Sequence, residues 1–159
     1  EGIEPTGYWD NPNIHPYTEF RTRRQTLEEY ARSIGLKLII GGKYGLRAFL
    51  DDVNGDYTGR CLHCYRMRFR SVAKYAAENG YSHFSSTLFV SPYQNHDLMI
   101  RAAEEAAEEF GVAFLHRDFR PYFRDGQTFA REHGFYMQKY CGCVFSEEER
   151  YLKAKKIIP

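Results

Sequence analysis

The chain has 159 residues, of which 43% are hydrophobic and 27% charged, so it fits one compact globular domain and is neither wholly disordered nor collagen-like or low-complexity. Its mean hydropathy is -0.61, and no apolar run approaches the roughly 20 residues that a membrane-spanning helix needs, so we expect a water-soluble protein without membrane association. Because 22 Lys and Arg residues are balanced by 21 Asp and Glu residues, the net charge is only +1, and affinity for nucleic acid would need local clusters of basic side chains.

The chain begins at Glu1, without an initiator methionine and without the basic start and apolar core of a signal peptide. We therefore interpret it as a trimmed or partial chain and expect a cytoplasmic protein. In that compartment four cysteines indicate metal or redox chemistry more than disulfide bonds.

The first half of the chain predicts a loop, a helix, a strand and a second, shorter helix. Two prolines exclude a helix over residues 11–16, where asparagines favour turns. Apolar residues then recur at helical spacing from about 18 to 34, and Gly35 ends this helix. Residues 36–40 have the pattern of a short buried strand, and a short helix follows around residues 46–50.

The second half continues this alternation of helices and strands. A helix begins at the Cys61 motif and runs to Glu78, and the alternating residues 81–90 predict a strand. The next helix reaches Phe110 and begins with either Asn95 or Asp97 as its cap. The remaining elements are a strand at 112–115, a polar loop at 118–125, a short helix at 128–132 and a final helix. A capping box of Ser146 and Glu149 begins this last helix, which extends to about Lys156.

Alternating strands and helices predict a single α/β domain over residues 1–159, with a parallel sheet flanked by helices. Such sheets bind ligands in the loops that follow the carboxyl ends of their strands. The polar loops that follow predicted strands lie at 11–16, 41–45, 85–97 and 116–125, and we expect them at one rim of the sheet.

The cysteines form two tight pairs, Cys61-Leu-His-Cys64 and Cys141-Gly-Cys143. The first pair lies at a predicted helix start, where backbone amides favour the thiolate form. In the second pair, the glycine lets the backbone bend so that both thiolates face the same way. Together the pairs predict a four-sulfur site. Their spacing leaves open a structural zinc, an iron–sulfur cluster, redox dithiols and unliganded cysteines.

Two polar stretches could bind a ligand. The amides and imidazole of Asn11, Asn13 and His15 lie in the double-proline loop, where they could contact a base or sugar or serve only the turn. Residues 85–97 contain more hydrogen-bonding groups than one helix cap requires, among them Tyr93, Gln94, Asn95, His96 and Asp97. Of these, His96 and Asp97 have the chemistry for proton transfer, with capping by Asp97 and solvation of His96 as the alternatives.

Arginines gather at three places: early in the chain, beside the first cysteine pair and in the loop after the last predicted strand. Guanidinium groups suit phosphate contacts, and the alternative is a solvated face with local ion pairs. The candidates for phosphate binding are Arg21, Arg24, Arg66, Arg68 and Arg120.

Several segments, taken together, resemble one known family. They are Asn11-Pro-Asn-Ile-His-Pro16, Cys61-x-x-Cys64-Tyr65 with Arg66 and Arg68, Phe84-Ser-Ser-Thr87, Ser91-Pro-Tyr-Gln-Asn-His-Asp97, Asp118-Phe-Arg120 and Tyr140-Cys-Gly-Cys143. In this order, and over nearly the whole chain, they resemble the QueH-type epoxyqueuosine reductases. The resemblance implies reductive removal of the epoxide oxygen from epoxyqueuosine at the wobble position of tRNA, the last step of queuosine biosynthesis. It also implies a fold similar to the adenine-nucleotide alpha-hydrolase group.

The resemblance further implies a 4Fe-4S cluster, with an additional mononuclear iron as an option, no cobalamin, and an external electron donor. The cysteines that match the family are the expected metal ligands: Cys61, Cys64, Cys141 and Cys143. The side chains expected to protonate or orient the substrate are Asp97, His96, Tyr93 and Asp118. Those expected to contact the modified base or the tRNA are Asn11, Asn13, His15, Gln94, Asn95 and the five arginines named above.

The chain departs from the family at its beginning. Members of the family start with a strand that ends in adjacent cysteines, and neither the strand nor the pair is present here. We therefore expect the first strand of the fold and part of the metal ligation to be missing. Two other functions stay open: a zinc-stabilised RNA-binding module without catalysis, and a thiol-based tRNA-modifying enzyme of the sulfur-transfer type.

Overall fold

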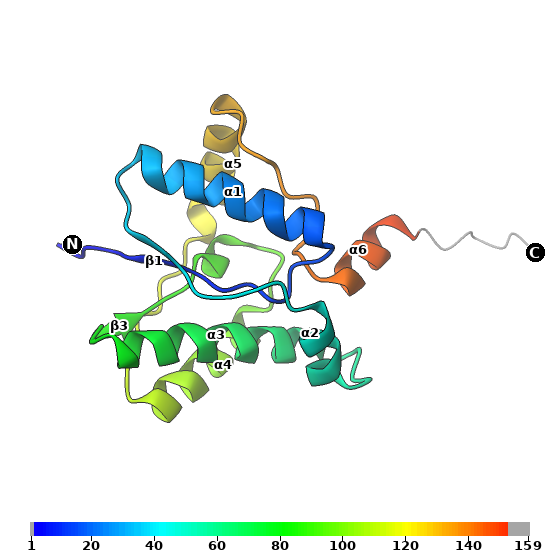
Figure 1. The fold of residues 1–159 in the computed structure, drawn as a ribbon, viewed down its shortest axis with the longest axis horizontal. Coiled ribbons are helices and arrows are strands. Elements are labelled where there is room, and N and C mark those ends of the chain that lie inside the picture. Colours follow the sequence, from blue (N-terminus) through cyan, green and yellow to red (C-terminus); the bar gives the residue numbers. More distant parts are fainter. Residues whose placement is uncertain (1, 153–159) are drawn as a thin grey trace, which may run out of the picture. The chain divides into compact units, whose positions relative to one another are not determined.

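The computed structural model describes residues 2–152 and confirms an α/β fold with parallel strands (Figure 1). The strands are β1 (Gly7–Trp9), β2 (Leu38–Ile40), β3 (His83–Phe84) and β4 (Ala113–Phe114). The helices are α1 (Tyr17–Ser33), α2 (Leu46–Val53), α3 (Arg60–Glu78), α4 (His96–Phe110), α5 (Phe123–Glu132) and α6 (Val144–Tyr151), with 3-10 helices η1 (Thr87–Val90) and η2 (Arg120–Tyr122). Among residues 2–152, no helix combines the length and the apolar composition that crossing a membrane requires.

The described residues form two compact units, one of residues 2–48 with 136–152 and the other of residues 49–135. Each unit contains one pair of parallel strands. The single domain over residues 1–159 stays a prediction.

In the first unit, β1 pairs in parallel with β2, so that Trp9 lies opposite Ile40. Helix α1 packs on this pair (Figure 1): the rings of Trp9 and Phe20 lie 5.7 Å apart, and Leu27 packs on the same small core. The predicted helix at 18–34 is therefore confirmed to within one residue at each end. The loops that follow β1 and β2 leave the same edge of the pair, as parallel pairing requires.

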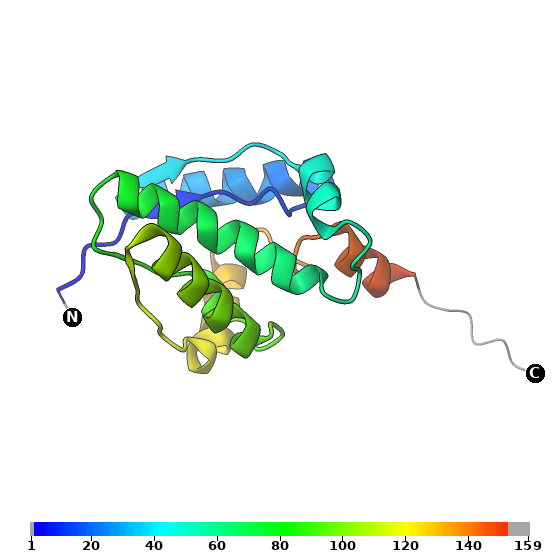
Figure 2. The same ribbon diagram turned by 90° about the horizontal axis from the view of Figure 1, so that it is seen from below.

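In the second unit, β3 pairs in parallel with β4, and α3 packs against α4 (Figure 2). Small side chains at the contact let the two helices approach closely. The buried residues that the two helices contribute to this core are Tyr65, Phe69, Ala73, Ala76, Met99, Ala102, Ala103 and Ala106. The buried residues recur at helical spacing in both α3 and α4, and for this reason the sequence pattern predicted both helices correctly.

Two predicted stretches of the second unit differ from the structure. The predicted strand at 81–90 is reduced to His83–Phe84, because the Ser86 hydroxyl accepts a hydrogen bond from Leu88 N and begins η1. The predicted loop at 118–125 contains η2 and the start of α5. There the Asp118 carboxylate accepts the amide of Arg120, and Pro121 favours the turn that follows.

The structure also decides how two helices begin: the sequence left the cap of α4 open between two residues and predicted the cap of α6 wrongly. Asn95 caps α4, since its side chain accepts a hydrogen bond from Leu98 N, and Asp97 lies inside the first turn. The capping box of Ser146 and Glu149 is wrong, because α6 is capped by the Cys143 sulfur, which accepts the amide of Ser146 at 3.4 Å. The predicted extension of this helix over 153–156 lies outside the described residues.

An ion pair joins α3 and α4 at their surface, and it gives a prediction. Glu105 accepts two hydrogen bonds from the Arg66 guanidinium, at 2.7 and 3.0 Å, and these lower the pKa of Glu105 from 4.5 to about 2. A carboxylate with a lowered pKa stabilises the fold above its ordinary pKa, and this contribution is lost as the pH falls from about 4.5 towards 2. Because both side chains are about 40% exposed, we expect Glu105→Gln to lower the free energy of unfolding at pH 7 by no more than about 1 kcal/mol.

Urea unfolding at pH 7 and at pH 3 measures this contribution, with Glu104→Gln as the control on the neighbouring exposed residue. The difference between wild type and Glu105→Gln should shrink at the lower pH. A difference that stays constant between the two pH values would show that the ion pair does not stabilise the fold.

Candidate functional site

The second cysteine pair, in the first unit, lies in the turn that leads into α6. The sulfurs of Cys141 and Cys143 are 4.0 Å apart, and the Cys141 sulfur lies 3.0 Å from the Ser146 hydroxyl. Contact with the Cys143 sulfur is the largest cause that lowers the pKa of Cys141, to about 5, and the same contact raises the pKa of Cys143. The hydroxyl of Ser146 and the charge of Arg23 also lower the pKa of Cys141. The pair therefore favours one thiolate, which is the form that binds metals.

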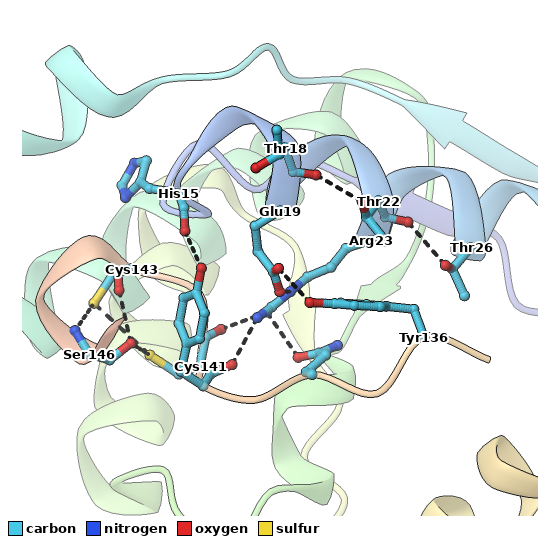
Figure 3. A network of polar contacts seen from close by, with 12 residues as sticks. His15, Thr18, Glu19, Thr22, Arg23, Thr26, Tyr136, Cys141, Cys143 and Ser146 are labelled. Carbon is cyan, nitrogen blue, oxygen red and sulfur yellow. Dashed lines mark hydrogen bonds and ion pairs between the residues drawn. The ribbon is translucent and has the colours of Figure 1, made fainter. Parts of the chain in front are cut away.

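A buried arginine on α1 binds the segment before this turn (Figure 3). The Arg23 guanidinium donates to the carbonyl oxygens of Tyr140 and Cys141, at 2.8 and 3.0 Å, and to the Gln138 side chain at 2.9 Å. It also pairs with Glu19 at 2.7 Å, and both side chains are at least 90% buried. Since a buried guanidinium must satisfy its donors, these bonds fix the backbone beside the first sulfur.

The other side of the turn contacts the double-proline loop through His15. The His15 Nε2 donates to the carbonyl of Pro12 at 3.0 Å, and Nδ1 accepts the amide of Val144 at 3.3 Å. Burial lowers the pKa of His15, so a neutral ring with its proton on Nε2 fits both partners. Both ring nitrogens are thus used within the protein, and His15 joins the loop to the cysteine turn.

The backbone on both sides of His15 strengthens this junction. The amide of His15 donates to the Gly142 carbonyl at 2.8 Å, and the Tyr140 hydroxyl donates to the His15 carbonyl at 2.6 Å. Gly142 has φ of +135°, and a Cβ there would lie 3.0 Å from Ile14 and 3.2 Å from the Arg23 guanidinium. Only glycine fits this combination of conformation and space, as the Cys-Gly-Cys spacing predicted.

The two asparagines of the same loop are buried rather than displayed on the surface. Asn11 is 7% exposed and Asn13 is 2% exposed. Among residues 2–152, the side-chain oxygen of Asn13 has no hydrogen-bond partner. An unpaired buried carbonyl costs about 1–3 kcal/mol, and a partner from outside the chain would reach this atom only if the loop moved.

The first cysteine pair, in the second unit, lies in the first turns of α3, as predicted. Cys61 is exposed and Cys64 is half-buried. Between them lies His63, whose Nδ1 is 3.3 Å from a carboxylate oxygen of Asp52 and whose Nε2 is 3.4 Å from one of Asp56. The residue after Cys64 connects this helix to the polar loop: the Tyr65 hydroxyl donates to the Gln94 side chain at 2.7 Å and accepts the amide of Asn95.

The predicted proton-transfer residues gather around the start of α4 and the loop after β4. His96 Nε2 lies 2.9 Å from the Ser91 carbonyl, and its ring packs edge-on against the buried Phe89. Asp118 binds the Arg120 guanidinium with both oxygens, and this contact is the largest cause that lowers the Asp118 pKa far below its usual range. The charge of His96 acts on Asp118, and that of Asp97 on Arg120, so the four groups are electrostatic neighbours.

The arginines predicted to bind phosphate differ in their partners within the protein. Arg24 pairs with Glu28 at 2.9 Å, and Arg66 pairs with Glu105. Arg21 is exposed and has no ion pair with any residue that the structure describes. Arg68 has interactions of its own. Tyr93, in contrast, is 82% exposed, and its ring packs edge-on against that of Phe123 at 5.7 Å.

Sequence analysis did not predict that four residues fix the Cys-Gly-Cys turn, although Arg23 belongs to the early arginine cluster and Tyr140 to the quoted Tyr140-Cys-Gly-Cys143 segment. The four residues are Glu19, Arg23, Gln138 and Tyr140. The Glu19–Arg23 spacing of four residues was a usable signal for a helical ion pair. The bonds from Arg23 to the chain 115 to 118 residues away were not readable from the sequence.

Both cysteine pairs have the donor chemistry for iron or zinc, since each offers two thiol sulfurs on one short segment. Within the part of the chain that the structure describes, no group of three or more His, Cys, Asp or Glu side chains could hold a metal ion. Each pair taken alone is therefore an incomplete ligand set.

The family described as "Epoxyqueuosine reductase QueH" matches residues 1–149 of the chain. Three proteins of that name illustrate the similarity. The protein from Dehalococcoides mccartyi is 39% identical over 153 residues, which cover 96% of this chain and 84% of that protein. The protein from Thermotoga maritima is 31% identical over 160 residues, covering 94% and 83% respectively. The Helicobacter pylori protein is 31% identical over 157 residues, covering 91% of this chain and 42% of that protein.

The buried ion pair on α1 gives a second prediction. Arg23→Gln removes the positive partner of Glu19 and three donors to the 138–141 segment. We expect it to lower the free energy of unfolding by about 3–5 kcal/mol, the usual effect of breaking a buried pair. Arg21→Gln, an exposed neighbour on the same helix, should change this free energy by less than about 0.5 kcal/mol.

Urea unfolding under reducing conditions compares these two variants with wild type. Arg23→Lys keeps the charge but not the planar fork of donors, so its loss should lie between those of the glutamine variant and the control. Equal stabilities of the Arg23 and Arg21 variants would contradict the role of this network.

Proposed function

The chain belongs to the Epoxyqueuosine reductase QueH family, and from this premise we propose that it reduces epoxyqueuosine to queuosine at the wobble position of tRNA. The match over residues 1–149, which contains both cysteine pairs and the polar loop at 91–97, is the observation that carries the proposal. We further propose that the protein is a cytoplasmic, metal-dependent oxidoreductase that works without cobalamin.

The reaction sets the chemical requirements of the site. Two carbon–oxygen bonds of the epoxide break, a carbon–carbon double bond forms, and the oxygen leaves as water. The substrate therefore takes up two electrons and two protons. The residues of the chain must hold the nucleoside, deliver protons and bind whatever supplies the electrons, which come from an external donor.

We propose a 4Fe-4S cluster, with an additional mononuclear iron as an option, bound through the thiolates of Cys61, Cys64, Cys141 and Cys143. When bound, such a cluster supplies electrons one at a time. The lowered pKa of Cys141 supports thiolate ligation at neutral pH.

We propose that His96 and Asp97, rather than Asp118, deliver the protons. Asn95 is the residue that caps α4, so Asp97 is not required for that purpose. Asp118 is held as a carboxylate by Arg120, and a carboxylate with so low a pKa does not give up a proton at neutral pH. We propose that Asp118 positions Arg120, and that Tyr93, Gln94 and Asn95 bind or orient the substrate.

For recognition of the modified base we propose Asn13 as the main contact from the double-proline loop. Its unpaired side-chain oxygen is buried, so in this proposal it accepts a hydrogen bond from a base or from the cyclopentane diol after the loop moves to expose it. In this proposal Asn11 supports the loop and His15 positions it, since both of its ring nitrogens already have protein partners.

The proposal is tested by purifying the chain without oxygen, reconstituting it with iron and sulfide, and incubating it with dithionite and tRNA that contains epoxyqueuosine. We expect a brown protein whose colour bleaches with dithionite, and mass spectrometry of the nucleosides should show conversion to queuosine. Cys64→Ser and Cys143→Ser should each lose iron and conversion, while Ser82→Ala, on a serine outside the proposed machinery, should retain both.

Other outcomes of this experiment would select another function. Zinc alone, with RNA binding but no iron, sulfide or conversion, would identify a zinc-stabilised RNA-binding module. A colourless protein that transfers sulfur to tRNA through its dithiols would identify a sulfur-transfer enzyme.

Asp97 gives a prediction that separates chemistry from binding. Asp97→Asn keeps the size of the side chain but removes its acid–base chemistry. We expect conversion in a single turnover to slow by about 100-fold or more, the usual contribution of general acid–base catalysis. The Kd for substrate tRNA should change far less. Equal losses in turnover and binding would instead assign Asp97 to substrate binding or to the structure of α4.

A further inference from the structure

We propose that Tyr17, Arg21, Lys43 and Arg47 form a binding surface for a single-stranded stretch of RNA, with a base stacked on Tyr17 and phosphates bound by the three cations. We call these four residues the Tyr17 surface. The proposal rests on the proposed function in one respect, since it takes the RNA to be the loop of the substrate tRNA. It adds a contact region that lies apart from the cysteines and from the 91–97 loop in the sequence.

The aromatic part of the surface is an open ring on a rigid support. Tyr17 is 54% exposed, although it is the first residue of α1. Its ring meets Tyr44 edge-on at 5.5 Å and lies 6.4 Å from the nearly parallel ring of Phe20, which is buried. A tyrosine held on one side and open on the other can stack on any nucleobase without ordering a mobile side chain first.

The cations of the surface differ from Arg23 and Arg24 of α1 because their charge is not neutralised. Arg21 lies one helical turn after Tyr17, while Lys43 and Arg47 flank Tyr44 in the chain; all three are exposed. Across residues 2–152, none of the three forms an ion pair or a side-chain hydrogen bond. Arg23 and Arg24, in contrast, are occupied by Glu19 and Glu28.

Tyr17 joins the two parts of the surface, because its ring contacts Tyr44, between Lys43 and Arg47 in the chain, and it lines one cavity with Arg21. Both ribbon views place the segment at 43–47 beside the first turn of α1 (Figures 1 and 2), in agreement with the ring contact between Tyr17 and Tyr44. A cavity of about 150 Å³ opens along the first turns of α1, lined by Tyr17, Phe20, Arg21, Arg24, Gln25 and Glu28.

The size of this cavity distinguishes between kinds of ligand. Pockets that enclose small molecules have volumes of about 300–1,000 Å³, so a cavity of about 150 Å³ suits one edge of an extended chain. An exposed ring beside unpaired cations favours RNA, because nucleic acid supplies both stacking faces and phosphates. An acidic protein segment would use the cations but not the ring.

The charges are tested by the salt dependence of RNA binding. The probe is a fluorescent, unmodified anticodon stem–loop, titrated with the full chain at several salt concentrations. Arg21→Gln, Lys43→Gln and Arg47→Gln should each reduce the slope of log K against log salt by about 0.7–0.9, the value for one lost phosphate contact. The control is Arg32→Gln, an exposed arginine three turns further along α1, which should leave the slope unchanged.

The ring is tested by two substitutions. Tyr17→Ala should weaken binding of the stem–loop by about 5- to 150-fold, while Tyr17→Phe should retain wild-type affinity, because stacking does not need the hydroxyl. If Tyr17→Ala also lowers the melting temperature, its weaker binding could come from unfolding. The Tyr17→Phe variant and the three charge variants then test the surface in its place. Tyr57→Ala, on a 60% exposed tyrosine of the other unit, is the control.

The possible outcomes separate this inference from the proposed function. If the wild type converts epoxyqueuosine while all surface variants bind the stem–loop with unchanged slopes and affinity, the Tyr17 surface is not an RNA site and the proposed function stands. Displacement of the stem–loop by polyglutamate as readily as by poly(U) would also overturn the RNA assignment. If the wild type binds no RNA and converts no substrate, both proposals fail.

Discussion

The buried ion pair between Glu19 and Arg23 is the interaction on which the arrangement of the first unit depends. Two charges that are at least 90% buried are stable only if their remaining hydrogen-bonding groups are also satisfied. Arg23 satisfies its own by binding Gln138 and the carbonyls of Tyr140 and Cys141, and Glu19 accepts a further bond from the Tyr136 hydroxyl at 2.6 Å. The requirement to pair one charge inside the protein thus brings residues 136–141 to α1.

Once this segment is fixed, the local chemistry of the cysteine turn follows. The Tyr140 hydroxyl, whose pKa burial raises to about 12, stays protonated and donates to the His15 carbonyl. Glycine between the cysteines lets the chain pass close to Ile14 and Arg23, and the Cys143 sulfur then begins α6 as its cap. Sulfur, imidazole and guanidinium groups are thereby held in place by hydrogen bonds within the protein.

The second unit reaches a comparable result by different means. Here the first turns of α3 carry a cysteine pair, and Tyr65 ties the same helix to the polar loop before α4 through Gln94 and Asn95. The Phe89 ring supports His96, and Asp118 holds Arg120 in a bidentate pair. Helix α3 thus carries a cysteine pair and is also bonded to the residues that begin α4, where we propose proton transfer.

The sequence predicted the long helices well, for a physical reason, whereas the roles of the site residues stay predictions. Helices α1, α3 and α4 each bury a stripe of apolar residues, and the helical spacing of these residues is visible in the sequence. The errors fall where a single side chain bonds to the backbone: Ser86 begins η1, Asp118 the turn at η2, and Cys143 caps α6. The sequence also presents Arg21, Arg23 and Arg24 as one cluster, and only the tertiary structure shows that one is buried, one is paired and one is exposed.

The central claim, that Arg23 holds the Cys-Gly-Cys turn against the double-proline loop, is tested most directly by amide hydrogen exchange in wild type and Arg23→Lys. The reporters are the amides of His15 and Val144, which bond to Gly142 and His15 across this junction. We expect the substitution to speed exchange at both amides while the amide of Gly41, bonded to Trp9 beside the strand pair, keeps its protection. Unchanged protection of His15 and Val144 in the variant would contradict the claim.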